Sequence, residues 1–422
     1  MRTNSLSPLE SHLVVKIADP LLMREINKYH VLETIRCHGQ ISRVEISERT
    51  LLSGTTVSAI TGALIEEGLI DAIHTQPHNE AQRGRPRVLL GLVPDAAYVL
   101  GIKISESVTT VTLVDFRGEL VASSQLPIRM ARQPADVITD IIEDALTDCV
   151  NKSGIDRSRI KGIGIGVPGL VDPRSGKSYS SSVFGEREIP IGSLLSERTG
   201  LPVKLEKPAN LLALAESWFG YAQAERTFAV ISLDQTASLG LWIESDLHRG
   251  ASTLGPTFGH IKVGGAGQPC ECGQVDCLNA YVSDAAMRRE AAARLGEGFL
   301  DRPLARTDIM GALAEASDAG VEAAQAVIDA QGARLGLGIS YVVNLINPEK
   351  IIVAFASSRY GELVAPALET AVAANSFRAH LATTQLIFHT LDDQLWARGA
   401  AALMLRDIYS APWTSAYQEE RK

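Results

Sequence analysis

The chain has 422 residues, of which 45% are hydrophobic and 21% are charged. This composition is typical of folded globular protein and excludes a disordered or collagen-like chain, and the length predicts two or three domains. A net charge of -9 excludes a protein coated in basic surface, but a small DNA-reading domain remains compatible with an acidic remainder.

Neither a membrane span nor a secretory signal is expected. No run of about 18 uninterrupted apolar residues occurs, and the first residues, MRTNSLSPLESHLVVKIADP, lack a sustained apolar stretch. Three of the five cysteines lie close together while Cys37 and Cys149 stand alone, which favours a metal site in a reduced compartment over a disulfide framework. We therefore expect a cytoplasmic protein with no membrane partner.

The N-terminal segment is predicted to begin with three helices. Apolar residues recur at helical spacing over residues 21–37, and Gly39 follows. Ser42 and Glu45 have the spacing of a capping box, which predicts a short helix from Arg43 to Thr50. Ser53 is a suitable N-cap for a third helix that reaches Glu67 and stops at Gly68.

The third helix has the pattern of a helix that lies in a major groove. Val57, Ile60 and Leu64 form its inward stripe, so small, mostly hydroxylic residues are left on the outward face. Small polar side chains near the N-terminus let such a helix approach the base edges closely. On this face and just before it, the candidate DNA-binding residues are Arg43, Ser53, Thr55, Thr56 and Ser58.

A wing is expected after the third helix. The apolar runs 69–73 and 88–93 are predicted to pair as two strands, and the connection between them contains Arg83, Arg85 and Arg87. Gly84 and Pro86 keep this basic tip extended, which suits contact with phosphates or a narrow minor groove. Two alternatives stay open: a three-helix module that binds protein, and a solvent-exposed Arg43 with no DNA role.

From residue 98 onward the sequence predicts two rounds of an α/β fold. Three strand-like segments, YVLGIKI, VTTVTLVDF and LVASSQLPI, are joined by tight turns, and a helix near 135–150 and a buried strand, GIGIGVPGLV, follow them. This order is that of a ribonuclease-H-like domain. A second round begins at TFAVISLD and SLGLWIES and has helices near 284–295 and 321–347. We expect a two-lobed body with a ligand in the cleft between the lobes.

The spacing of Gly164, Gly166 and Gly169 matches G-x-G-x-x-G but does not predict a dinucleotide site. Such a site needs a helix immediately after the glycines, with its N-terminus facing the pyrophosphate. Here Pro168 lies inside the motif and the turn-rich stretch LVDPRSGKSYSSS follows it.

A compact cluster predicts a structural zinc site. His260 is followed by Cys270, Cys272 and Cys277, and three thiolates with one imidazole complete a tetrahedral zinc shell without an open position. Glycines 264, 265, 267 and 273 supply turns that would let these ligands converge. The alternative is a loop of reduced thiols with an unrelated histidine.

Over nearly its whole length the chain resembles the ROK family (repressors, open reading frames and sugar kinases), in its repressor branch with an N-terminal winged helix. The matching stretches are ISRVEISERTLLSGTTVSAITGALIEEGLI, RGRP, GIGIGVPGLVDPRSG, GLPVKLEKPANLLALAE, GHIKVGGAGQPCECGQVDCLNAYVS and LGISYVVNLINPEKIIV. The resemblance implies an actin- or hexokinase-type two-lobed body, and structural zinc at the four clustered ligands.

The sequence departs from the kinases of this family at the positions that carry phosphoryl transfer. Where they have N-D-A-N, with the aspartate as general base, the chain has Lys207, Pro208, Ala209 and Asn210. The two phosphate loops read 103–107, KISES, and 235–240, QTASLG, and the glycine pair near the nucleotide is replaced by Ala354 and Phe355. We therefore expect neither kinase activity nor a requirement for ATP.

The sugar-binding positions are altered as well. A hydroxyl-binding glutamate is replaced by Thr257, the glutamate after the last zinc cysteine is replaced by Asn279, and Lys207 stands beside the missing base, whereas Asn210 and His260 are retained. These five are the candidate effector-binding residues. Our hypothesis is a sugar or polyol that carries a negative group, or another small metabolite; the alternative is a decayed pocket that binds nothing.

Taken together, the sequence predicts a DNA-binding transcriptional regulator, a repressor by resemblance, which binds double-stranded operator DNA as a homodimer or higher homo-oligomer and is controlled by a small effector. The expected domains are a winged helix-turn-helix at 1–92, a first lobe at 93–215 completed by about 395–422, and a second lobe with the zinc loop at 216–394. The alternatives are an ATP-dependent sugar kinase with an accessory helix-turn-helix domain, and an interaction scaffold.

Overall fold

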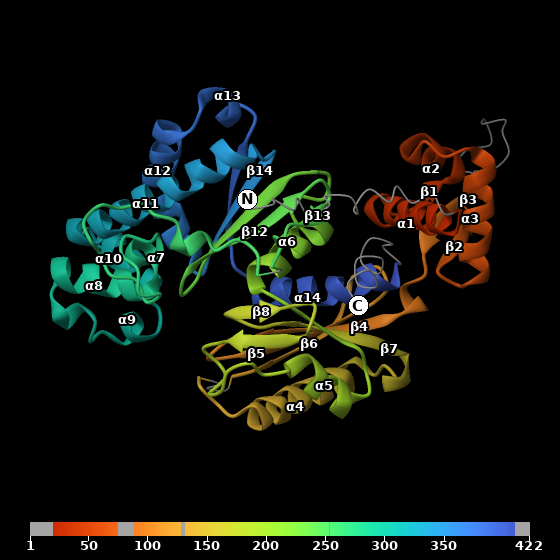
Figure 1. Ribbon diagram of the computed structural model, residues 1–422, viewed down its shortest axis with the longest axis horizontal. Coiled ribbons are helices and arrows are strands. Elements are labelled where there is room, and N and C mark those ends of the chain that lie inside the picture. The colour runs from red at the N-terminus through yellow and green to blue at the C-terminus, as the bar shows by residue number, and fades with distance from the viewer. Residues whose placement is uncertain (1–19, 75–87, 128–130, 253, 410–422) are drawn as a thin grey trace, which may run out of the picture. The chain divides into compact units, whose positions relative to one another are not determined.

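The computed structural model describes residues 20–74, 88–127, 131–252 and 254–409. These residues form two compact units (Figure 1). The first contains the N-terminal residues up to Ala96 together with those from Arg406 onward, and the second contains Ala97–Leu405.

The first unit is a winged helix. Three helices precede a small sheet with the strand order β1-β3-β2, in which both pairs are antiparallel. Its elements are α1 (Pro20–His38), β1 (Ile41–Ser42), α2 (Arg43–Thr50), α3 (Gly54–Glu66), β2 (Ile70–His74) and β3 (Val88–Leu92). The three predicted helices and both predicted wing strands are confirmed. The two-residue strand β1, which joins the sheet beside β3, was not predicted.

Local side-chain bonds explain why the helices begin where they do. The Ser42 hydroxyl accepts a hydrogen bond from the Glu45 backbone N–H, and the Glu45 carboxylate accepts one from the Ser42 N–H, so the capping box is confirmed. Ser53 caps α3 by accepting from the Thr56 N–H. Burial of the stripe that contains Val57 and Leu64 against α1 and the wing supplies the core of this unit.

The end of the chain also contributes to the first unit. Helix α14 (Asp393–Ile408) passes the division between the units, and the side chains of Arg406 and Tyr409 are buried. On α1, Glu33 accepts two hydrogen bonds from Arg36, at 2.9 and 2.5 Å. Burial raises the pKa of Glu33, but the charges of Arg36 and Arg406 outweigh that effect and hold the pKa below its usual value. Arg406 and Tyr409 group with the first unit because the charged groups on which they act, Glu33 and Arg36, lie on α1.

The second unit contains two five-stranded sheets of identical topology. The first sheet has the order β10-β7-β4-β5-β6: β5 lies antiparallel to both neighbours, whereas β4, β7 and β10 run parallel. Its elements are β4 (Tyr98–Ile104), β5 (Thr109–Val114), β6 (Leu120–Leu126), α4 (Ala135–Ser153), β7 (Ile160–Gly166), α5 (Ile191–Thr199) and β10 (Val203–Glu206). The strand hairpin β8 (Leu170–Asp172) and β9 (Lys177–Ser180) extends from it.

The second sheet repeats this arrangement with the order β13-β12-β11-β14-β15. Its strands are β11 (Phe228–Leu233), β12 (Ala237–Ile243), β13 (Asp246–Leu247), β14 (Lys350–Phe355) and β15 (Gln385–Thr390). The accompanying helices are α7 (Asn279–Val282), α8 (Asp284–Leu295), α9 (Pro303–Thr307), α10 (Ile309–Asp318), α11 (Glu322–Ile346), α12 (Ser358–Asn375) and α13 (Arg378–Leu381). The duplicated α/β body predicted from the sequence is thus confirmed.

Two helices, α6 (Pro208–Phe219) and α14, lie between the sheets and pack at close range (Figure 1). A Cβ on Gly101 of β4 would lie 1.8 Å from the Ala397 carbonyl oxygen of α14, and one on Gly240 of β12 would lie 2.2 Å from the Ala209 oxygen of α6. The two helices also meet each other, because a Cβ on Gly399 would lie 2.1 Å from the Leu211 oxygen. Glycine is therefore required wherever these backbones touch.

The glycine motif at 164–169 has a structural role, in agreement with the prediction that it forms no dinucleotide site. Gly164 lies inside β7, where a Cβ would be 1.7 Å from the Ala400 oxygen. Gly169 has a φ of +99° in the turn that leads to strand β8 and not to a helix. In the described part of the chain, no helix has the length and apolar character needed to span a bilayer.

Candidate functional site

The outward face of α3 is open, as a DNA-reading helix requires. Thr55 and Ser58 are exposed, whereas Thr56 is half-buried and shares a 2.8 Å hydrogen bond with the hydroxyl of Ser53. Ser53 and Thr56 therefore stabilise the start of the helix as well as lying near its exposed face. Arg43 donates from Nε to the hydroxyl of Thr61 at 2.8 Å, which fixes this arginine against α3. Arg83, Arg85 and Arg87 lie outside the described residues.

The turn between α2 and α3 contains a strained residue. Leu51, the C-cap of α2, has φ 56° and ψ 19°, the left-handed region that usually requires glycine, and its side chain is 91% exposed. The turn is closed instead by the Ser47 hydroxyl, which donates to the Leu52 carbonyl at 2.6 Å. These contacts set the angle between the two helices of the motif.

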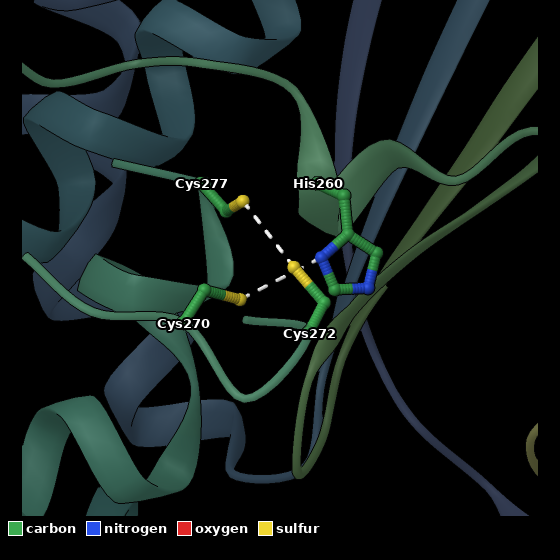
Figure 2. A group of neighbouring side chains, drawn as sticks. All are labelled: His260, Cys270, Cys272 and Cys277. Carbon is green, nitrogen blue, oxygen red and sulfur yellow. Dashed lines mark hydrogen bonds between the residues drawn. The ribbon is translucent and has the colours of Figure 1, made fainter. Parts of the chain in front are cut away.

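The four predicted zinc ligands converge (Figure 2). His260 ends the short turn η3 (Phe258–His260), and the three cysteines come from the loop that follows, so all four are held by one segment. Their ligand atoms lie within 4.8 Å of one another. The sequence prediction that these residues share a site is consistent with this geometry.

The spacing of the ligand atoms fits zinc. A tetrahedral ion with ordinary Zn–S and Zn–N bond lengths separates two sulfurs by about 3.8 Å and a sulfur from a nitrogen by about 3.6 Å. Cys272 Sγ lies 3.8 Å from Cys277 Sγ, and Cys270 Sγ lies 3.6 Å from His260 Nδ1. The ammonium of Lys262, 3.5 Å from Cys277 Sγ, would offset part of the negative charge of three thiolates.

A buried carboxylate lies at the N-terminal end of α6. Glu206 is fully buried and forms an ion pair with Arg249, whose Nε lies 2.6 Å from Oε2. Its other oxygen accepts hydrogen bonds from the Lys207 backbone N–H at 3.0 Å and from the Asn210 side-chain amide at 2.9 Å. Sequence analysis missed Glu206 and Arg249; a glutamate that ends a buried strand beside Lys207 was the available signal.

Lys207 ties this end of α6 to a loop far away in the sequence. Its ammonium donates to the carbonyl oxygens of Leu254 at 2.9 Å and Pro256 at 3.1 Å. Gly255 between them has a φ of +67°, and a Cβ there would lie 2.8 Å from Lys207 Nζ, so this loop requires glycine. Burial lowers the pKa of Lys207, an effect that the nearby charge of Glu206 opposes.

Asn210 presents a buried acceptor. Because its Nδ2 donates to a carboxylate, the orientation of the amide is fixed, and Oδ1 points the other way. That oxygen is buried and has no hydrogen-bond partner among the described residues. A buried, unbonded acceptor is costly unless a ligand or water supplies a donor.

Two further predicted effector residues, Thr257 and His260, lie in the same loop, and Asn279 of α7 packs against it. Thr257 follows Pro256 and is exposed, and its carbonyl accepts from the His260 N–H at 3.0 Å. Asn279 accepts from the Ala237 N–H at 3.0 Å and packs directly against Gly259. Residues 254–260 thus link Lys207 and Asn210 with Asn279 and the metal cluster.

Internal contacts occupy two of the positions at which the sequence departs from the family's kinases, one in the first phosphate loop and one at the glycine pair near the nucleotide. Lys103, at the end of β4, forms an ion pair with Asp393 and lies 4.0 Å from the centre of the Trp396 ring, both on α14. Phe355, at the end of β14, is fully buried against Tyr360 and Phe388. Neither position offers the glycine backbone that wraps a phosphate.

Comparison with known proteins identifies both units. A model of the ROK family matches residues 99–407, and a model of winged helix-turn-helix DNA-binding domains matches residues 24–71. The chain belongs to the ROK family. Among solved structures, a ROK family transcriptional regulator described as a homolog of the E. coli MLC protein is similar over 92% of this chain and 97% of its own, with 25% identity and a TM-score of 0.77.

Two relatives that match more than 90% of the chain are regulators. The xylose repressor of Caldicellulosiruptor bescii is 27% identical over 395 residues, 93% of this chain and 98% of its own. The DNA-binding transcriptional dual regulator NagC of Escherichia coli is 25% identical over 387 residues, 91% and 93% of the two chains. A ROK glucokinase of Streptomyces griseus, with a TM-score of 0.60 and 25% identity, covers only 73% of this chain.

These comparisons confirm the predicted class. This ROK protein is a DNA-binding transcriptional regulator and not an enzyme: the xylose repressor, NagC and the solved ROK regulator each match more than 90% of the chain, whereas the glucokinase matches 73%. The predicted winged helix-turn-helix and the sugar-kinase-like fold of the body are likewise confirmed.

Proposed function

We propose that this ROK regulator represses transcription of carbohydrate-related genes by binding operator DNA, and that a small carbohydrate-type effector at the N-terminal end of α6 controls the binding. Relatives that match the whole chain are named as a xylose repressor and as NagC, which supports a sugar-responsive repressor. The single observation that carries the DNA-binding part is the open, small-residue face of α3 around Thr55 and Ser58.

The DNA contacts follow from the winged helix. Thr55 and Ser58 would meet base edges, Ser53, Thr56 and Arg43 would position the helix start, and Arg83, Arg85 and Arg87 would contact phosphates or the minor groove. A two-fold operator requires a two-fold protein, so the active species is a homodimer or a higher homo-oligomer in the cytoplasm.

The effector would lie between α6 and the 254–260 loop. Lys207 and Asn210 come from the start of α6, and Thr257 and His260 come from the loop that Lys207 joins to it. Asn279 is the first residue of α7 and packs against Gly259 of that loop. Zinc at His260 and the three cysteines would hold the loop in the conformation that presents these residues, which makes the metal structural. We propose no role for ATP, because the sequence lacks the general base and the phosphate loops of the family's kinases. We keep a winged helix at 1–92 and a lobe division near residue 215 as part of this proposal.

DNA binding is tested by fluorescence anisotropy on the upstream region of the gene itself. The double variant T55A/S58A should weaken binding at least tenfold, because each lost base contact costs about 1–3 kcal/mol. Thr147→Ala, an exposed threonine of α4, is the matched control and should bind as the wild type does. Equal affinity of T55A/S58A and wild type would refute α3 as the reading helix.

A salt series on the same DNA separates this function from a protein-binding scaffold. Affinity should fall steeply as NaCl rises from 50 to 200 mM, on the order of 10³-fold or more if six or more phosphates are contacted. A coupled ATP assay with xylose, glucose and N-acetylglucosamine should give no turnover. Efficient phosphorylation together with indifference to DNA would reverse the proposal.

A further inference from the structure

The charges at the N-terminal end of α6 do not balance. Glu206 is fully buried, and Arg249 neutralises it in a direct ion pair. Lys207 adds a second positive charge, and among the described residues it forms no ion pair: its ammonium is held by the carbonyl oxygens of Leu254 and Pro256. These three side chains therefore leave one uncompensated positive charge in a largely buried place, which is costly without a counter-charge.

The helix adds to this positive potential. Lys207 is the N-cap residue of α6, and its own side chain caps no backbone N–H, while Glu206, already paired with Arg249, accepts from the Lys207 N–H. The N-terminus of a helix carries a partial positive charge that favours an anion close to it. The helix runs for 12 residues, long enough for the effect to be developed at its first turn.

The same place offers an acceptor for a hydrogen-bond donor, such as a ligand hydroxyl. Asn210 lies in the first turn of α6, one turn from Lys207, and its buried Oδ1 lacks a partner among the described residues. Lys207 uses two of its three N–H groups on carbonyls, so one remains to meet a single oxygen atom. A ligand that completes this site by itself therefore carries one negative charge and at least one hydrogen-bond donor, which in a carbohydrate is a hydroxyl group.

We propose that the effector is a sugar acid, a polyhydroxylated carboxylate whose carboxylate meets the Lys207 ammonium and whose hydroxyl donates to Asn210 Oδ1. The inference rests on the proposed effector site and names the class of its ligand. One carboxylate balances the excess charge, whereas a phosphate monoester, which carries about two negative charges at neutral pH, would leave a net negative charge.

Matched pairs of ligands test the class. Isothermal titration of the full-length protein is carried out with glucose against gluconate and glucuronate, with xylose against xylonate, and with glucose 6-phosphate. At least one acid should bind tenfold or more tightly than its neutral parent. Lys207→Met should abolish this preference, whereas Lys207→Arg should retain most of it. Lys161→Met, an exposed lysine of β7, is the control and should leave the preference unchanged.

Each outcome decides one of two questions. Neutral parents that bind as tightly as the acids, a phosphate that binds more tightly, or no binding of any acid would overturn the sugar-acid inference. Operator binding measured on the same preparations decides the proposed function separately, so either can fail alone. If Lys207→Met loses its zinc and its DNA binding and has thus misfolded, the comparison of acid with neutral parent on the wild-type protein still decides the ligand class.

Discussion

Replacing Leu51 with glycine should stabilise the helix-turn-helix. The residue occupies the left-handed region at φ 56° and ψ 19°, where a Cβ costs about 1–2 kcal/mol. Its side chain is 91% exposed, so little buried apolar surface is lost with it. Glycine also increases the conformational entropy of the unfolded chain, which offsets about 0.5–1 kcal/mol of this stabilisation. The net expectation is a stabilisation of about 0.5–1 kcal/mol.

Hydrogen exchange of the full-length protein measures this locally. Amides in α2 and α3 that open with the motif should exchange about two to five times more slowly in Leu51→Gly than in the wild type. Leu51→Ala is the matched control, because alanine removes the apolar side chain but keeps the Cβ. If the glycine and alanine variants protected these amides equally, the strain would not lie in the backbone at this position and the reasoning would be wrong.

Three further predictions concern stability and metal content. Glu33→Gln leaves Arg36 without its carboxylate and should lower the free energy of unfolding by about 1–3 kcal/mol. Because the folded pKa of Glu33 is held below 4.5, the advantage of the wild type is full above that pH and should shrink as the pH falls. Urea unfolding at several pH values would show or contradict this trend. Tyr360→Phe removes a fully buried hydroxyl that has no partner among the described residues, so the melting temperature should stay equal or rise; a clear fall would reveal a bonded hydroxyl. Cys272→Ser should lower the zinc content well below the one ion per chain expected for the wild type. Cys149 is buried on α4 and is not part of the cluster, so Cys149→Ser should leave the zinc content unchanged. Elemental analysis of both variants checks this.

Local patterns were predictable where a few neighbouring residues determine the structure. The capping box of Ser42 and Glu45 and the cap at Ser53 appear in the structure as expected, because their partners lie only three residues away. The convergence of His260 with the three cysteines was equally predictable, since the four residues lie within one segment. The pairing of Ile41 and Ser42 with β3 was missed, because two residues are too few to show a strand pattern.

Long-range partners could not be deduced from the residues alone. Sequence analysis named Lys207 as an effector-binding residue and predicted no protein partner for it, whereas its ammonium donates to the carbonyl oxygens of Leu254 and Pro256, 47 and 49 positions further on. Arg249 was missed as the partner of Glu206 for the same reason. Gly101 of β4 and Gly164 of β7 allow α14 to pack directly against these strands. Nothing in the neighbouring sequence predicts this role, because the contact exists only in the folded chain.

The route of α14 has a consequence for anyone who divides this protein. A fragment that ends at residue 96 contains all three helices of the winged helix, yet it omits Arg406, whose charge acts on Glu33, and the buried Tyr409. A body trimmed of its last turn would in the same way leave the DNA-reading part incomplete, although nothing near the effector residues had been cut. Residues from both ends of the sequence form the first unit, so a chimera that moves the DNA-binding unit to another regulator must include both.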